Sequence, residues 1–202
     1  MTGDIAPFFA PLFALGLGLA SMPLIMFASH KFRWFDRHDE RKVHNGDVPR
    51  LGGVGIWIAF TLATVISFFL SLGSPEIQAS WNVANPLLLL AASALVFLLG
   101  LRDDFAHVPA LQKLVAQIGA GILVVLAGLS IDSIYIPFTD LELALPAFAA
   151  APLTVLWVVG LTNAINLIDG VDGLAGGVSA MASLGYGLAA LASGNLVVAV
   201  LS

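Results

Sequence analysis

The chain has 202 residues, of which 59% are hydrophobic and only 10% are charged, and its formal net charge is −5. A water-soluble domain carries about 25% charged residues, so this composition excludes an ordinary soluble protein. The absence of cysteine excludes disulfides and any cysteine-ligated metal site. We therefore expect an integral membrane protein, and the acidic balance argues against nucleic acid as a partner.

Six uncharged stretches follow one another along the chain, and each can hold one helix across a bilayer, which takes about 20 apolar residues. They are Ile5–Ser29, Leu51–Pro75, Ile77–Leu101, Leu114–Ile131, Leu143–Ile168 and Gly173–Ser202. After the turn Ser193-Gly194-Asn195, Leu196–Leu201 begins another apolar run. The predicted fold is an all-α polytopic membrane bundle of six transmembrane helices and the start of a seventh. We expect residues 1–202 to form a single transmembrane domain, the N-terminal portion of a longer protein, with no soluble domain.

All eight basic residues fall in two of the loops between these stretches. The first loop holds Lys31, Arg33, Arg37, Arg41, Lys42 and Arg50, and the loop between the third and fourth stretches holds Arg102 and Lys113. By the positive-inside rule both loops are cytoplasmic, and the N-terminus is outside. The same alternation puts the segment Thr162–Gly173 on the cytoplasmic side of the inner (plasma) membrane.

The outer loop Ser130–Pro146 contains alternating apolar and β-branched residues such as Ile131, Ile134 and Ile136. This alternation predicts a short β-hairpin at the membrane interface.

Two adjacent carboxylates, Asp103 and Asp104, lie at the inner end of the third stretch. Neighbouring carboxylates repel each other and are costly at a membrane boundary. A divalent cation would neutralise the pair, or one member would cap a helix, and the residues alone leave both explanations open. Because oxygen ligands suit hard ions, the cation would be Mg²⁺ or Mn²⁺.

Four polar residues, Asn163, Asn166, Asp169 and Asp172, recur at every third position. This spacing puts their side chains near one face of a helix end. Gly170 and Gly173 let the backbone bend there or approach a ligand closely. A helix C-cap followed by an N-cap would use one or two of these side chains, so the full set favours a functional site.

A basic loop, Arg41–Gly53, precedes the second stretch and includes Lys42 and His44. Clustered basic side chains bind phosphate groups of a substrate or of lipid heads. Topology alone would explain most of these charges, but not His44 beside Lys42. The glycines that open the second stretch permit close helix packing or close approach of a ligand. Carboxylates and a basic loop at one membrane edge indicate metal-assisted chemistry on a phosphate.

Three motifs occur in this order and topology: Lys42-x-His44 with Pro49-x-x-Gly52-Gly53, the Asp103-Asp104 pair, and Asn163-x-x-Asn166-x-x-Asp169-Gly170-x-Asp172-Gly173-Leu174. Together they resemble the polyprenyl-phosphate N-acetylhexosamine-1-phosphate transferases over nearly the whole chain. The resemblance implies that a polyprenyl (undecaprenyl) phosphate oxygen attacks the β-phosphorus of a UDP-N-acetylhexosamine, with UDP-GlcNAc favoured. The products are polyprenyl-diphospho-sugar and UMP, in the first membrane step of cell-envelope glycan synthesis.

The resemblance also implies roles for single residues. Asp103 and Asp104 are the catalytic pair, one of them contacting the lipid phosphate as a base. The metal site for Mg²⁺ or Mn²⁺ takes Asp103, Asp104, Asp169 and Asp172. Substrate-binding residues are Lys42, His44, Lys113, Asn163, Asn166, Asp169 and Asp172. A homodimer is a further expectation of the family.

The chain departs from the family pattern in two places. Many relatives carry a proline ahead of the basic motif, where this chain has Asp36-Arg37-His38. The family's later aspartate and histidine-rich loop have no counterpart before Ser202, so we expect these 202 residues to be inactive alone.

Two other classes compete with the enzyme. A membrane transporter with a cytoplasmic-side carboxylate ion site would also use intramembrane acids and glycine-broken helices. Transporter sites usually lie near the bilayer midplane in paired repeats, whereas these acids cluster at the inner boundary and no internal repeat is found. A non-catalytic scaffold would leave the Asn/Asp series unexplained.

Overall fold

The computed structural model describes residues 6–34, 51–71, 85–136, 138–139, 141–170 and 173–194. The chain divides into two compact units, Met1–Asn82 with Asn166–Ser202, and Val83–Ile165. Three of the expected site residues, Lys42, His44 and Asp172, lie outside the described ranges, as does the expected start of a seventh helix.

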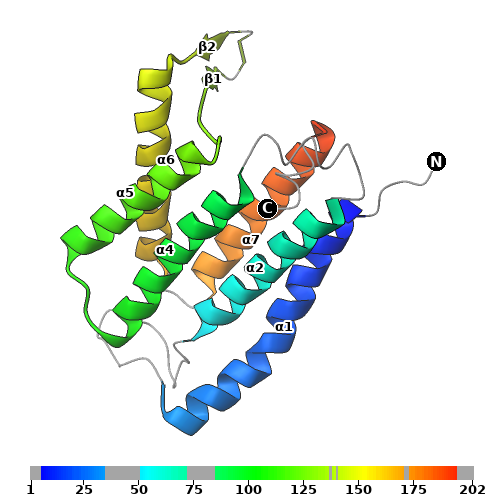
Figure 1. Cartoon of the computed structure of the whole chain (residues 1–202), viewed down its shortest axis with the longest axis vertical. Helices are drawn as coiled ribbons and strands as arrows, with labels where there is room; N and C mark the ends of the chain where they lie inside the picture. The colour runs from blue at the N-terminus through cyan, green and yellow to red at the C-terminus, as the bar shows by residue number, and fades with distance from the viewer. Residues whose placement is uncertain are drawn as a thin grey trace. The chain divides into compact units, whose positions relative to one another are not determined.

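Within the described ranges the chain forms helices α1 (Ala6–Phe32), α2 (Gly52–Ser71), α4 (Pro86–Phe105), α5 (Ala110–Leu126), α6 (Ala147–Ile168) and α7 (Leu174–Ala192), drawn in Figure 1. Each overlaps one of the six uncharged stretches, which confirms a mainly helical architecture. Five of them are long and apolar enough to cross a membrane, whereas α5, with 17 residues, is shorter. The count of six spans and the outside N-terminus stay predictions.

Helix α4 begins later than the apolar run suggests, and the cause is a helix cap. The Asn85 side chain accepts hydrogen bonds from the backbone N–H groups of Leu87 (3.0 Å) and Leu88 (3.4 Å). Pro86 fills the first helical position, where no N–H is needed. The helix then continues through Phe105, so that Asp103 and Asp104 lie in its last turn.

Helices α1 and α2 pack through small side chains. Ala59, Ala63 and Ser67 are buried at four-residue spacing on α2, in line with Gly55. A Cβ atom at Gly55 would lie 2.5 Å from the Ser21 hydroxyl oxygen and 2.6 Å from the Ile25 Cδ1 atom of α1, so any larger residue would displace these side chains. Small residues in such a row let helix backbones come close in a membrane. The prediction that the glycines opening the second stretch serve close packing is confirmed for Gly55.

Helices α4 and α5 form an antiparallel hairpin that is tied at both ends. At one end the Asn85 N–H donates to the Ala127 carbonyl oxygen over 2.7 Å. At the other, Lys113 of α5 contacts Asp103 of α4. These ties fix where the acidic end of α4 lies along α5.

Helix α6 packs against α5 through a glycine and a threonine. A Cβ atom at Gly121 of α5 would lie 3.0 Å from the Cα atom of Val155. The buried Thr154 hydroxyl accepts a hydrogen bond from the Ile131 N–H over 2.9 Å and donates to the Ala150 carbonyl oxygen. The first of these contacts joins α6 to α5, and the second joins α6 to the segment that follows α5.

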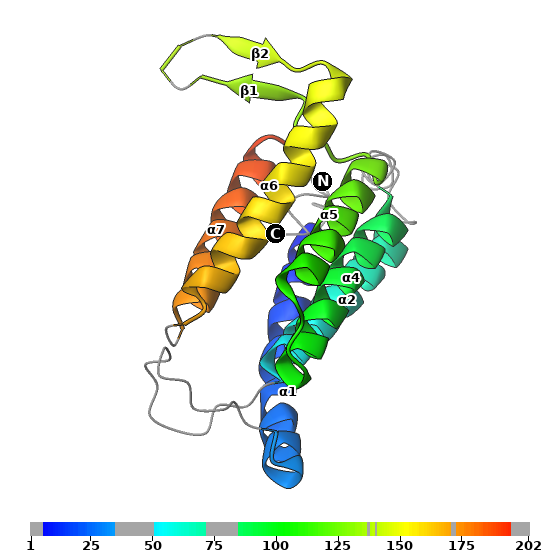
Figure 2. The ribbon, with the colours of Figure 1, turned by 90° about the vertical axis from the view of Figure 1, so that its left-hand side faces the viewer.

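The predicted hairpin is confirmed, whereas its place on the outer side stays a prediction. Strands β1 (Ser133–Tyr135) and β2 (Glu142–Ala144) pair antiparallel, with Ile134 opposite Leu143. Figure 2 shows the strands beyond the first turn of α6. Within the described ranges this small sheet is added to a set of helices.

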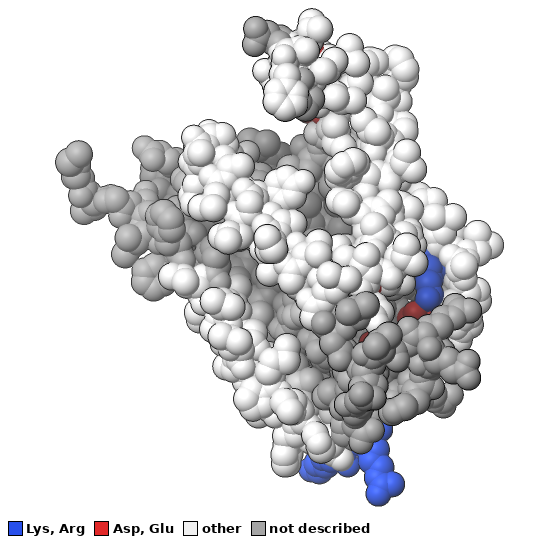
Figure 3. Space-filling model, turned by 180° about the vertical axis from the view of Figure 1, so that it is seen from behind, with Lys and Arg blue, Asp and Glu red and all other residues white. Residues whose placement is uncertain are grey.

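Most of the described surface is apolar. On the face drawn in Figure 3, charged side chains occupy only a small part of the described area. Large apolar residues such as Leu87, Leu156 and Leu167 are well exposed on the helices. A soluble monomer rarely exposes so much apolar helix surface, so these faces suit contact with lipid.

Candidate active site

Asp103 and Lys113 form an ion pair at the turn between α4 and α5. The Lys113 Nζ atom donates to Asp103 Oδ2 over 2.5 Å, and the Val108 N–H donates to Asp103 Oδ1 over 3.0 Å. The Lys113 side chain is 32% exposed and the Asp103 side chain is 29% exposed. Asp103 thus fixes the turn and holds an ammonium group at the helix ends, where it is still partly open to a ligand.

The structure gives Asp103 a partner, Lys113, that neither explanation from the sequence includes, and cation binding by the acidic pair stays a prediction. The N-cap of α5 is Pro109, which makes no side-chain cap, so Asp103 is not an N-cap. Instead it accepts from Val108, one residue earlier, whose own side chain is 1% exposed. A lysine, ten residues along the chain, supplies the neutralising charge. Asp104, its neighbour, is exposed.

One helical turn beyond Lys113, Gln117 bonds to Asn163 of α6. The Asn163 Nδ2 atom donates to Gln117 Oε1 over 2.7 Å, and Gln117 Nε2 donates back to Asn163 Oδ1 over a longer 3.5 Å. Asn163 Nδ2 also donates to the Val159 carbonyl oxygen over 2.8 Å. Gln117 is only 6% exposed. The motifs do not include Gln117, and its signal in the sequence is an amide within the apolar part of a helix, four residues after Lys113.

Three predicted site residues therefore follow one another across α4, α5 and α6. Asp103 contacts Lys113, and Asn163 bonds to Gln117, one turn along α5 from Lys113. These four residues are called the polar line below. Asn166 lies further along α6, and Asp169 lies in the turn after it. Both are exposed and belong to the other compact unit.

The bend expected at Gly173 is confirmed. Gly173 precedes α7 with φ +76°, a left-handed conformation that favours glycine. The turn that carries Asp169 is thus followed by a backbone position that a side chain would strain.

The described site residues offer oxygen atoms that could bind a metal ion. Among the described residues, no three His, Cys, Asp or Glu side chains gather to hold an ion. Both oxygens of Asp103 accept hydrogen bonds, and each keeps a lone pair for an ion. The described candidates offer carboxylate and amide oxygens, which fit Mg²⁺ or Mn²⁺; they are Asp103, Asp104, Asp169, Asn163 and Asn166.

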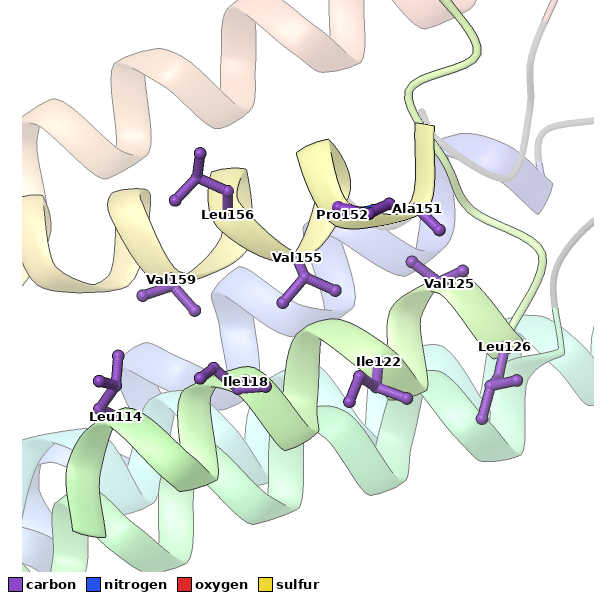
Figure 4. Close-up of a pocket in the computed structure, with 10 residues that line it drawn as sticks. All are labelled: Leu114, Ile118, Ile122, Val125, Leu126, Ala151, Pro152, Val155, Leu156 and Val159. Carbon is purple, nitrogen blue, oxygen red and sulfur yellow. The ribbon is translucent and has the colours of Figure 1, made fainter. Parts of the chain in front are cut away.

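An apolar groove of about 520 Å³ lies between α5 and α6. Figure 4 shows Leu114, Ile118 and Ile122 of α5 across from Val155 and Val159 of α6. Leu114 directly follows Lys113, and Val159 precedes Asn163 by one turn. The groove therefore runs up to the polar line, an arrangement suited to a molecule with an apolar tail and a polar head.

Comparison with known proteins gives consistent relatives. Residues 86–202 match the family model described as glycosyl transferase family 4. The chain is 34% identical over 180 residues (89% of the chain, 47% of the relative) to the "probable undecaprenyl-phosphate N-acetylglucosaminyl 1-phosphate transferase" of Bacillus subtilis. It is 31% identical over 147 residues (72% and 36%) to the decaprenyl-phosphate N-acetylglucosaminephosphotransferase of Mycobacterium leprae.

A third relative is the phospho-N-acetylmuramoyl-pentapeptide-transferase of Listeria welshimeri, with 32% identity over 185 residues (84% of the chain, 54% of the relative). No solved structure matches the chain. The chain spans about a third to about half of the length of these relatives.

Proposed function

The chain belongs to glycosyl transferase family 4, and on that premise we propose that the whole protein transfers GlcNAc-1-phosphate from UDP-GlcNAc to a polyprenyl phosphate. The Asp103–Lys113 pair carries the proposal, because it combines a held ammonium group with the end of an apolar groove. GlcNAc is chosen over other N-acetylhexosamines because the relatives from Bacillus and Mycobacterium are named for it.

The proposed reaction exchanges one phosphorus–oxygen bond for another. An oxygen of the lipid phosphate forms a bond to the β-phosphorus of the UDP-sugar. The bond from that phosphorus to the bridging oxygen breaks, and UMP leaves with the oxygen and its electron pair. Such transfers are catalysed mainly by positioning and by stabilising the phosphate charge.

In this proposal the residues divide the work by charge. Lys113 donates to phosphate oxygens, and Asp103 holds it in place. Asp104 is the member of the acidic pair that contacts the lipid phosphate as a base. Both members of the pair, with Asp169 and Asp172, would also hold Mg²⁺ or Mn²⁺. The bound ion would neutralise diphosphate charge. Lys42 and His44, with Asn166, remain proposed contacts to the substrates.

The apolar groove is proposed to receive the first isoprenoid units of the lipid. Its lining is aliphatic, and it runs up to Lys113, so a phosphate head and an apolar tail fit together. Replacing Ala151 in the groove by phenylalanine is expected to raise the KM for polyprenyl phosphate about tenfold, because the larger ring excludes one isoprenoid unit. The KM for UDP-GlcNAc should not change.

The control for the groove is Ala147→Phe, at the exposed first residue of α6. Steady-state kinetics, with each substrate varied in turn, gives the KM for polyprenyl phosphate and the KM for UDP-GlcNAc of both variants. If Ala147→Phe and Ala151→Phe have equal effects, or if only the KM for UDP-GlcNAc rises, the lipid does not bind in this groove.

A multi-pass membrane setting fits the five apolar helices. We propose the inner (plasma) membrane, with the N-terminus outside, six spans and the active face in the cytoplasm, because every basic residue lies in the two loops expected there. A homodimer belongs to the same proposal.

The test is release of UMP from UDP-GlcNAc by the purified full-length protein with undecaprenyl phosphate and Mg²⁺. We expect turnover that stops when EDTA removes the ion and returns with Mg²⁺ or Mn²⁺. A protein that binds both substrates without releasing UMP would contradict the proposal. Flux of an ion across proteoliposomes would instead favour the transporter, although Asp103 and Asp169 lie at helix ends rather than mid-helix.

A further inference from the structure

The amide pair between α5 and α6 fixes which atom of Asn163 is available to a ligand. A backbone carbonyl can only accept a hydrogen bond, so the Asn163 atom that contacts the Val159 oxygen must be the nitrogen. The short 2.7 Å contact with Gln117 then joins this nitrogen to the glutamine oxygen. Both N–H groups of Asn163 are thereby used inside the protein.

The Asn163 oxygen, unlike the nitrogen, can still take part in a further hydrogen bond. Among the described residues, the hydrogen bond that it accepts comes from Gln117 Nε2 and is long at 3.5 Å. A carbonyl oxygen accepts two hydrogen bonds, so this atom keeps acceptor capacity. The residue as a whole is exposed, although its partner Gln117 is buried. Asn163 therefore offers a ligand an oxygen and no N–H.

Gln117 is not the sole contact between α5 and α6. Gly121 of α5 also approaches Val155 of α6 closely, and Thr154 of α6 accepts a hydrogen bond from Ile131 in the segment that follows α5. A buried amide in an apolar membrane helix is costly unless it bonds, and leucine would pack there without that cost. The hydrogen bonds to Asn163 are the gain that the glutamine brings.

We infer that Gln117 is a positioning residue, which turns the Asn163 amide so that its oxygen receives a hydrogen-bond donor of the UDP-sugar or the bound divalent ion. This inference rests on the proposed function. It also excludes a phosphate oxygen as the partner of Asn163, because two acceptors repel each other. Phosphate contacts are left to cations such as Lys113.

The experiment measures UDP-GlcNAc binding to the full-length protein in nanodiscs by calorimetry, with and without Mg²⁺, and Mn²⁺ binding by electron paramagnetic resonance. Gln117→Leu is expected to weaken UDP-GlcNAc binding about tenfold, the size of one lost hydrogen bond in a buried site. Gln117→Glu should restore most of the affinity, because a carboxyl oxygen still accepts from Asn163 Nδ2. The matched control is Gln112→Leu, an exposed glutamine on the same helix.

A double-mutant cycle tests whether Gln117 acts through Asn163. Asn163→Ala should cost about as much as Gln117→Leu, and the double variant should be no weaker than Asn163→Ala alone. The KM for UDP-GlcNAc should rise while the KM for polyprenyl phosphate and the thermal midpoint stay constant. A purely structural role would instead lower the midpoint and raise both KM values.

The binding measurements with and without metal show whether the Asn163 oxygen contacts the sugar nucleotide or the metal ion. Weaker UDP-GlcNAc binding both with and without Mg²⁺ assigns the oxygen to the sugar nucleotide. Weaker Mn²⁺ binding, with a UDP-GlcNAc defect only when metal is present, assigns it to the ion. Wild-type affinity in Gln117→Leu, or additive losses in the double variant, overturns the inference. Failure of the wild-type protein to bind UDP-GlcNAc would instead sink the proposed function.

Discussion

Replacing Lys113 by methionine in the full-length protein is expected to lower the rate of UMP release about 10³-fold. Methionine keeps the apolar stem and removes the ammonium group that Asp103 holds at the turn between α4 and α5. A preorganised positive group facing a transferring phosphate contributes about 10²–10³ in rate. The loss of its partner also leaves the Asp103 carboxylate as an unpaired charge close to the bound phosphates.

The measurement is UMP release at saturating concentrations of both substrates. The control is Lys31→Met, which removes a basic residue from the last turn of α1 and should leave the rate within a few-fold of wild type. Asp103→Asn should lose less than Lys113→Met, because the ammonium group remains and an amide oxygen still accepts from Val108. If the Lys113→Met protein turns over at nearly the wild-type rate, Lys113 does not contact the transferring phosphate.

The second large effect is expected from valine at Gly121. A Cβ atom there would lie 3.0 Å from the Cα atom of Val155 and 3.2 Å from its Cγ1 atom. Because a backbone atom cannot rotate aside, α6 must move away from α5, at a cost of about 1–3 kcal/mol in stability. The same movement separates Gln117 from Asn163, so we also expect UDP-GlcNAc affinity to fall at least tenfold.

Gly160→Val is the matched control, because a Cβ atom at Gly160 of α6 meets nothing within 4 Å. Thermal unfolding in detergent and UDP-GlcNAc binding are measured on both variants. If Gly121→Val unfolds at the wild-type temperature, or if Gly160→Val is equally damaged, the close approach does not determine the packing of these helices.

The helices and the hairpin could be predicted because their signals are local. A long uncharged run predicts a membrane helix whatever packs beside it, and alternation around Ile134 predicts a strand. The helix ends were less predictable. The start of α4 depends on Asn85, a capping residue inside a region that hydropathy alone reads as part of the span.

The site could be predicted only as a set of residues, not as contacts. The motifs identify Asp103, Lys113 and Asn163, but not that Asp103 neutralises Lys113 instead of capping a helix. That pairing depends on how the turn brings residues ten positions apart together. Gln117 belongs to no motif, and only the packing of α6 on α5 gives its amide a partner.

Helix α5 carries both Lys113 and Gln117, and a helix rises about 6 Å over four residues. The Lys113 ammonium group and the Gln117 amide that turns Asn163 therefore keep a fixed separation along one rigid helix. A ligand that uses both contacts must carry its phosphate and its second group at a matching separation. A helix, and not a loop, thus sets which ligands can make both contacts at once.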